Sequence, residues 1–246
     1  MHRCLITTEK ILQDQCILEK EEARHLQTVL RVKEGDVVEL FDGKGRIRPA
    51  TVSALAKHSI TLQAADEIHQ VPPHKTSVTL FACISKGKRM DWTIEKAVEL
   101  GADRIIPVVS EHTIVRVTSE EDRKDKTQRW QRIADEAGRQ CGTAWVPQIA
   151  LPLSIEETLP LVRDAAPVFV GALTPGVKPL REEISKWTTP PPKAGWYIGP
   201  EGDFTPEEVE TLVQTGAIPV NLGNLVLRTE TACMYGLSVI NCLFLC

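Results

Sequence analysis

The chain has 246 residues, of which 42% are hydrophobic and 25% are charged, and its formal net charge is −4 at pH 7. These values are those of an ordinary globular protein, and they exclude the disordered and fibrous classes. The net negative charge excludes a protein that binds nucleic acid with its whole surface, so any such contact must be a local basic patch.

Cysteines and histidines give no sign of a metal site. The seven cysteines are scattered and form no Cys-x-x-Cys pair, and the six histidines show no metal-ligand spacing. We therefore predict reduced, mostly buried cysteines and no metal. The N-terminus has no apolar signal segment, and the apolar run 231–246 is shorter than the ~20 residues of a membrane span. We expect a cytoplasmic protein with no membrane partner.

The first part of the chain has the pattern of a small β-barrel. Asp42-Gly43-Lys44-Gly45 lies between two expected strands, where its glycines can take the positive φ that a hairpin turn requires. One helix, from Glu21 to about Leu30, interrupts the strands. Apolar and polar residues alternate over 3–7, 15–19, 36–41, 48–55 and 59–65.

The run 69–75 contains Pro72 and Pro73, which stiffen the chain and remove backbone donors. We place a domain boundary there and predict domains 1–72 and 73–246. Beyond it, strands alternate with helices, which is typical of a parallel sheet covered on both faces. The first of these helices begins near Lys88 and is expected to end at Gly101. The expected strands are 77–84, 104–109, 146–150, 167–173, 195–199 and 218–222.

Ligands of open α/β sheets bind beyond the carboxyl ends of the strands, so the loops after the late strands are the candidate site. The first loop, 199–204, is rich in glycine and precedes a helix that Thr205 should cap, with Pro206 at its first position and Glu208 completing a capping box. The second loop, 222–228, is apolar and could line an adenine pocket. Taken alone, the first loop is more often a tight strand-to-helix turn than a ligand loop.

Basic and acidic residues suggest further roles. The cluster Lys86-Gly87-Lys88-Arg89 lacks the spacing of a nucleotide phosphate loop, and is either a patch for an RNA backbone or a set of solvated cations. Glu230 at the start of the last helix is explained by the helix dipole. Arg228 is on the unfavourable side of that dipole, which indicates a functional partner.

The two loops together, Gly199-Pro200-Glu201-Gly202 and the segment LGNLVLRTETA at 222–232, resemble the signature of RsmE-type ribosomal RNA methyltransferases, which are members of the SPOUT class. The stretches 86–101 and 136–147 are similar to the central motifs of that family. Residues 25–43 match its PUA-like RNA-binding barrel. The resemblance covers essentially the whole chain.

The resemblance implies an α/β fold in which a PUA-like β-barrel precedes a parallel-sheet SPOUT domain with a C-terminal deep trefoil knot. It implies a homodimer that uses S-adenosylmethionine to methylate the N-3 position of a uridine in 16S ribosomal RNA of the small subunit. Two other functions stay open: a non-catalytic RNA-binding or ribosome-assembly protein on the same scaffold, and a SPOUT ribose 2′-O-methyltransferase.

Candidate site residues follow from the loops and the resemblance. Arg228 would stabilise the anion on the base oxygens, and Glu201 would act as a base or orient the substrate. Candidates for RNA binding are Arg31, Lys86, Lys88, Arg89 and Arg116. Candidates for cofactor binding are Gly171, Ala172, Leu173, Gly199, Pro200, Glu201, Gly202, Leu222, Gly223, Leu225, Val226, Leu227, Thr231 and Ala232.

Four positions depart from the family pattern. Asp203 stands where a second glycine is usual, and Thr143, Leu225 and His112 stand where arginines are usual. Up to three positive charges are therefore missing, which should weaken the grip on RNA.

Overall fold

The computed structural model describes residues 2–29 and 31–245, and these form two compact units. Unit 1 runs up to Pro73 and also takes in Gly138–Val146, whereas unit 2 consists of His74–Ala137 and the chain from Pro147 onward. The expected division into domains 1–72 and 73–246 remains a prediction. The predicted first domain did not include Gly138–Val146, which the structure assigns to unit 1.

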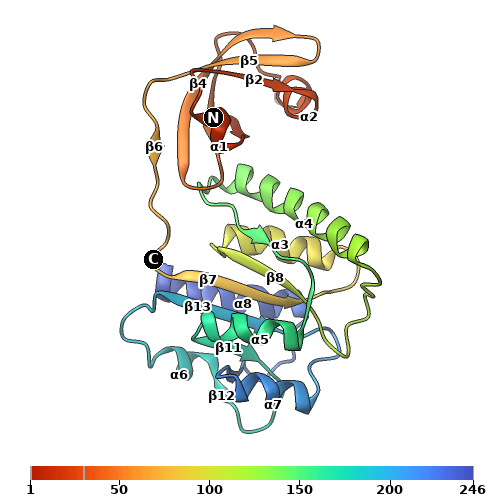
Figure 1. Ribbon diagram of the computed structural model, residues 1–246. Coiled ribbons are helices and arrows are strands. Elements are labelled where there is room, and N and C mark those ends of the chain that lie inside the picture. The colour runs from red at the N-terminus through yellow and green to blue at the C-terminus, as the bar shows by residue number, and fades with distance from the viewer. Residues whose placement is uncertain (1, 30, 246) are drawn as a thin grey trace. The chain divides into compact units, whose positions relative to one another are not determined.

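Unit 1 is a six-stranded sheet in the order β1-β3-β4-β5-β2, with β6 paired to β4 (Figure 1). All of its strand pairs are antiparallel except β1 with β3. The five predicted strands are confirmed, and Gly43 (φ +68°) and Gly45 (φ +94°) make the expected turn between β3 and β4. The strands are β1 (His2–Leu5), β2 (Gln15–Glu19), β3 (Val37–Phe41), β4 (Arg46–Ala56), β5 (Ser59–Ala64) and β6 (His69–Gln70).

Three details of unit 1 differ from the expectation. A short helix, α1 (Thr8–Ile11), follows β1 because the Thr7 side chain accepts a hydrogen bond from the backbone of Lys10 and caps it. The helix expected over 21–30 is α2 (Lys20–Arg24) followed by a π-helical turn, η1 (His25–Val29), and Leu30 lies outside the described residues. The segment expected as a linker contributes β6.

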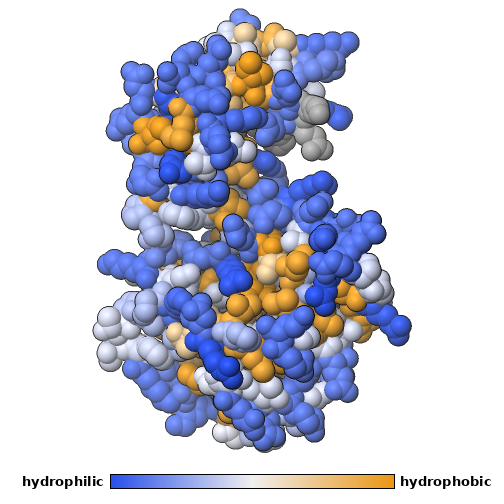
Figure 2. All heavy atoms as spheres, viewed as in Figure 1, coloured by the Kyte–Doolittle hydropathy of each residue, from blue (hydrophilic) through white to orange (hydrophobic). Residues whose placement is uncertain are grey.

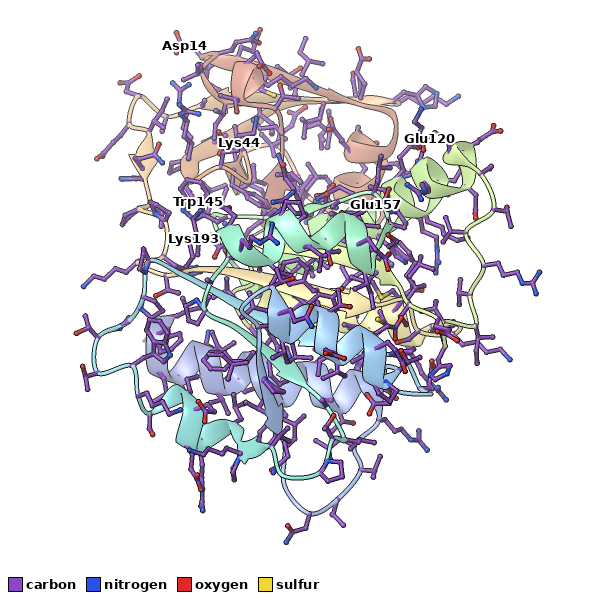
Figure 3. The ribbon with its side chains drawn as sticks, turned by 60° about the horizontal axis from the view of Figure 1, so that its bottom comes forward. Asp14, Lys44, Glu120, Trp145, Glu157 and Lys193 are labelled. Atoms are coloured by element: carbon purple, nitrogen blue, oxygen red, sulfur yellow. The ribbon has the colours of Figure 1, made fainter. Side chains whose placement is uncertain are left out.

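The segment Gly138–Val146 joins unit 1 through the turn between β3 and β4. Lys44 forms an isolated antiparallel bridge with Trp145, and the Val146 amide donates to the Gly43 carbonyl at 3.0 Å (Figure 3). The Trp145 indole Nε1 donates to the Val71 carbonyl at 3.2 Å. These bonds satisfy backbone groups of unit 1. The sequence pattern predicts the hairpin turn but not this second segment bound to it.

Unit 2 is an eight-stranded sheet in the order β10-β8-β7-β13-β11-β14-β12, with β9 paired to β8. Every one of its strand pairs is parallel, as the alternation of strands and helices predicts. The strands are β7 (Ser77–Cys83), β8 (Arg104–Val109), β9 (Gln148–Ile149), β10 (Leu153–Ser154), β11 (Val168–Gly171), β12 (Lys178–Pro179), β13 (Lys193–Ile198) and β14 (Ile218–Asn221).

Helices cover both faces of this sheet, with α5 and α7 on the side opposite to α3 and α8 (Figure 1). Gly101 (φ +80°) follows α3 as expected, and Thr205 and Glu208 form the predicted capping box of α7. The helices are α3 (Arg89–Glu99), α4 (Glu120–Cys141), α5 (Ile155–Asp164), α6 (Leu180–Ile184), α7 (Pro206–Gln214) and α8 (Thr229–Ile240), which ends in a π-helical turn, η2 (Asn241–Leu245).

Neighbouring aromatic residues of β13 pack on opposite faces of the sheet. The Tyr197 ring stacks on Phe81 at 4.9 Å, and its hydroxyl lies 3.1 Å from that of Thr158 on α5. The Trp196 ring lies under α8, and its Nε1 donates to the Ala232 carbonyl at 3.2 Å. A Cβ at Gly236 would come within 2.0 Å of the Trp196 indole, so only glycine fits there.

The cysteines Cys4, Cys16, Cys83 and Cys233 are buried free thiols, whereas Cys141 and Cys242 are exposed; Cys246 lies outside the described residues. Burial raises the pKa of Cys4 to about 12, so this thiol is neutral. No helix in the described part of the chain is long and apolar enough to cross a membrane. On the face drawn in Figure 2, hydrophilic side chains cover most of both units.

We expect Gly236→Ala to destabilise the protein by about 1–3 kcal/mol, because the added methyl group overlaps the Trp196 indole and one of the two elements must shift. Ser238→Ala, an exposed position on the same helix, is the control and should change the free energy of unfolding by less than about 0.5 kcal/mol. Urea unfolding of both variants measures the difference. Equal stabilities would contradict the close approach of α8 to β13.

Candidate functional site

The carboxyl ends of three neighbouring strands carry the candidate site. β11 pairs in parallel with both β13 and β14, so the loops that follow these strands leave the same edge of the sheet. Together with the start of α8, they enclose a cavity of about 520 Å³. This volume is within the roughly 300–1,000 Å³ range of small-molecule sites.

Most of the candidate cofactor residues line this cavity, although they come from three separate segments. Gly202 and Thr231 are the two that do not line it. Those that do are Gly171, Ala172, Leu173, Gly199, Pro200, Glu201, Leu222, Gly223, Leu225, Val226, Leu227 and Ala232, and Arg228 lines it with them.

Several residues that line the cavity were not predicted from the sequence as cofactor residues. Asn221 ends β14, and its side chain contacts two separate segments. Its Oδ1 accepts from the Gly223 amide of the following loop at 3.3 Å, and its Nδ2 donates to the Val177 carbonyl, directly before β12, at 2.8 Å. An asparagine directly after a strand and close to a glycine is a turn signal that could have identified it. Thr174, Ile198 and Thr229 were not predicted either, whereas Arg89 was expected to bind RNA and Asp203 was noted only as a departure from the family pattern.

Asp203 connects two of the loops. Its backbone has φ +58°, a left-handed conformation that aspartate tolerates better than most residues and glycine accepts freely. Its Oδ2 accepts a hydrogen bond from the Leu173 amide at 3.1 Å. A glycine at this position would fit the backbone but could not make this link, so the aspartate ties the loop after β11 to the loop after β13.

His112 also binds the loop after β13. Its Nδ1 lies 3.0 Å from the Gly202 carbonyl and 2.9 Å from the Asp203 carbonyl, so Nδ1 carries the proton. The bond to the Asp203 carbonyl raises the pKa of His112 above its ordinary value. A Cβ at Gly202 would lie 3.0 Å from the His112 Cβ, which explains a glycine that packs beside the cavity without lining it.

Glu201 forms an ion pair with Arg89. Its Oε1 accepts from the Arg89 Nη1 at 2.9 Å and from the Lys86 amide at 3.3 Å. Burial raises the pKa of Glu201, but hydrogen bonds from its own backbone, from Lys86 and from Arg89 outweigh burial and lower the pKa overall. Glu201 is therefore a charged, engaged carboxylate, which suits an orienting role better than proton removal.

A second hollow, of about 590 Å³, adjoins the cavity and shares Arg89 and Arg228 with it. It brings together most of the candidate RNA-binding cations with residues from the start of α8. Arg116 and Arg31 are exposed but lie outside both hollows, and Arg31 is in unit 1. The lining consists of Lys86, Lys88, Arg89, Trp92, Arg228, Glu230 and Thr231.

Comparison with known proteins shows the family. A model described as an RNA methyltransferase domain matches residues 72–241, and one described as an RNA methyltransferase PUA domain matches residues 18–64. The chain belongs to the RNA methyltransferase family. Within it, the chain is 30% identical to ribosomal RNA small subunit methyltransferase E of Buchnera aphidicola, over 91% of this chain and 87% of that protein.

Other relatives agree with this family. Ribosomal RNA small subunit methyltransferase E of Synechocystis is 29% identical and covers 98% of this chain, which spans 78% of that protein. The structure of ribosomal RNA small subunit methyltransferase E from Neisseria gonorrhoeae, solved bound to S-adenosylmethionine, superposes with a TM-score of 0.85 at 30% identity and covers 99% of this chain and 98% of its own. The chain is thus an RNA methyltransferase related to the ribosomal RNA small subunit methyltransferases E, as its motifs predict. The comparisons therefore do not support the non-catalytic alternative.

We expect Asp203→Ala to speed hydrogen exchange of the Leu173 amide about tenfold, because the amide loses a charged acceptor. Asp203→Asn should keep most of the protection, because its side-chain carbonyl can accept the same bond and asparagine tolerates the left-handed backbone. The amide of Trp196, in the buried strand, is the internal control. Unchanged exchange at Leu173 in Asp203→Ala would show that the two loops are held together by other contacts.

Proposed function

We propose that this methyltransferase transfers a methyl group from S-adenosylmethionine to the N-3 position of a uridine in 16S ribosomal RNA. The observation that carries the proposal is a cavity at the carboxyl edge of the sheet that opens beside a cation-lined hollow and shares two arginines with it. Such a substrate places the activity in the cytoplasm.

The residues of the cavity fit the cofactor. Leu225 and Val226 are 79% and 76% exposed, so their apolar side chains are available to cover an adenine ring. Gly223 has φ +114° and open space around its Cβ position, which lets the backbone approach a ligand. Bound there, the cofactor would supply a methyl group on a sulfonium centre. No group of side chains that could hold a metal occurs in the described ranges, and the proposal needs none.

Methyl transfer needs alignment more than it needs a reactive protein group. The N-3 proton of uridine is lost only well above neutral pH, so the protein must stabilise the base anion. Arg228 lines both the cavity and the hollow, and its guanidinium would meet the negative charge on the uracil oxygens. Arg89, held by Glu201, supplies a second positive charge.

The hollow and unit 1 would hold the flanking RNA. Lys86 and Lys88 are exposed cations of the hollow and are suited to bind phosphates. Arg116 is another exposed cation of unit 2, outside the hollow. Unit 1 contains the PUA match and Arg31, and we propose that it is a barrel that binds RNA next to the target base. Because N-3 faces the pairing edge, the uridine must be unpaired when it is methylated.

We further propose that the C-terminal segment is knotted. β14 pairs with β11 on the side away from β13, yet α8, which follows β14, packs against β13 and α3. The segment between β14 and α8 must therefore cross β11 to bring α8 to β13. A deep trefoil knot is the arrangement that the family resemblance implies.

Incubation with labelled cofactor and undermethylated small subunits, followed by nucleoside mass spectrometry, tests the function. The proposal expects 3-methyluridine. A 2′-O-methylated nucleoside would establish the ribose methyltransferase instead, and labelled cofactor that binds without transfer to RNA would contradict both.

We expect Arg228→Ala to lower turnover by roughly 10² or more while cofactor affinity is nearly unchanged, because its charge acts on the transition state. Gly223→Val should abolish both, because a β-branched residue is strained at φ +114° and its side chain enters the cavity. Gly216→Val is the matched control, since Gly216 has φ +104° and open space but lies outside the cavity. Calorimetry and single-turnover assays measure both quantities. Loss of cofactor binding in Arg228→Ala would make Arg228 a cofactor residue.

We also expect a homodimer built partly on the last helix. Ala232, Leu237 and Ile240 are buried against the sheet, whereas Tyr235 and Leu243 are large, apolar and exposed. Tyr235→Asp should therefore halve the mass measured by light scattering, while Val213→Asp, at an exposed apolar position of α7, should leave it unchanged. A wild-type monomer at micromolar concentration would contradict the prediction.

A further inference from the structure

Glu230 carries an unusual carboxylate in the first turn of α8. Its side chain is only 13% exposed, and its Oε2 is buried with no hydrogen-bond partner among the described residues. A buried carboxylate oxygen without a donor carries an uncompensated cost of desolvation. The dipole of α8 offsets part of this cost but supplies no donor to Oε2. An oxygen of this kind is suited to accept a proton or a hydrogen bond from a ligand.

The neighbouring cation does not satisfy Glu230. The Arg89 Nε lies 3.9 Å from the Glu230 Oε1, which is too long for a hydrogen bond, while the Arg89 Nη1 donates to Glu201 at 2.9 Å. Arg89 is therefore oriented by Glu201 and only attracts Glu230 through space. Of these two carboxylates, Glu201 is engaged and Glu230 retains a free oxygen.

Glu230 lines the hollow together with Arg228, and Arg228 also lines the cofactor cavity. The hollow is thus lined by a carboxylate that has one buried, unpaired oxygen and by a guanidinium, and it borders the cavity proposed for the cofactor. Trp92, 43% exposed, adds an aromatic surface on which a base can stack. A planar imide, one N–H between two carbonyl oxygens, is complementary to this set of groups.

We propose that Glu230 accepts the N3–H of the target uracil, selects uracil over cytosine, and removes the proton during methylation. This inference rests on the proposed function and assigns the proton acceptor within it. Cytosine presents an unprotonated N3 acceptor, which would face the carboxylate with two lone pairs opposed and no proton between them. Sites that hydrogen-bond a substrate N–H reject an analogue without it by as much as ~10⁴.

The N3–H bond breaks, its proton goes to the Glu230 carboxylate, and its electron pair stays on the ring, where Arg228 faces the charge on the oxygens. N3 then bonds to the methyl carbon as the carbon–sulfur bond breaks and its pair returns to sulfur. The sulfonium becomes a neutral thioether, and the Glu230 carboxyl afterwards releases its proton to water.

The test uses full-length protein with Glu230→Gln, which keeps the size of the side chain but not its charge, and Glu230→Asp, which keeps the charge. Glu207→Gln, an exposed carboxylate in the first turn of α7, is the matched control. The first readout is binding without cofactor of small subunits that carry either uridine or cytidine at the position methylated by the wild type. We expect the wild type and Glu207→Gln to prefer uridine at least tenfold, and Glu230→Gln to lose that preference.

The second readout is the single-turnover rate as a function of pH. Glu230→Gln should be slower by roughly 10²–10⁴ at neutral pH, and the deficit should shrink as the pH rises, because the uracil then loses its proton to solvent. Glu230→Asp should recover part of the rate, and cofactor affinity should stay within about threefold of the wild type in both variants. Unchanged uridine preference or a pH-independent deficit in a folded Glu230→Gln would overturn the assignment, even if wild-type protein makes 3-methyluridine. Absence of 3-methyluridine with the wild type would instead overturn the proposed function.

Discussion

The contact between Trp196 and α8 is the constraint on which the site depends. The indole donates to the Ala232 carbonyl at 3.2 Å, and Gly236 lets the helix backbone lie directly on the ring. Trp196 stands two residues before the end of β13, and Ala232 lies in the first turn of α8. The contact therefore places the start of the last helix, with Arg228 and Glu230, beside the loop that carries Glu201.

The two carboxylates near Arg89 differ in their hydrogen bonding. Arg89 lies close to two carboxylates but forms a short bond with only one of them, Glu201, which the Lys86 amide also contacts. Partly buried carboxylates are stable as anions when they are well hydrogen-bonded, and they become reactive when they are not. The structure thus separates an orienting carboxylate from one with a free oxygen, although both belong to the same cluster.

Three of the four positions expected to depart from the family pattern take part in local structure. Asp203 adopts a left-handed backbone and connects two loops, and His112 binds the carbonyl groups of the same turn. Thr143 accepts from the Trp145 amide and donates to its carbonyl inside unit 1. Asp203, His112 and Thr143 therefore serve here to shape loops, and three of the five cations expected to bind RNA line the hollow beside the cavity, namely Lys86, Lys88 and Arg89.

Local features of this chain could be predicted because they depend on residues close together in sequence. Periodicity predicted most strands and helices of both units, although not α1, β6, β10 or β12. The cap at Thr205, the turn at Gly43 and Gly45, and the end of α3 before Gly101 follow from side chains and backbone freedom at those residues. The resemblance of the loops 199–202 and 222–232 added the family, which the comparisons confirm, and the candidate location of the site.

Only the tertiary structure decided which distant residues meet. Arg89 reaches Glu201 across 112 positions of the chain, Gly138–Val146 belongs to unit 1, and Gly202 packs against His112 instead of lining the cavity. The order of the strands and the free oxygen of Glu230 also become visible only in the folded chain. Sequence periodicity reports which face of an element is apolar. These contacts depend instead on the order of the strands and on the packing of α8 on β13, which involve residues far apart in the chain.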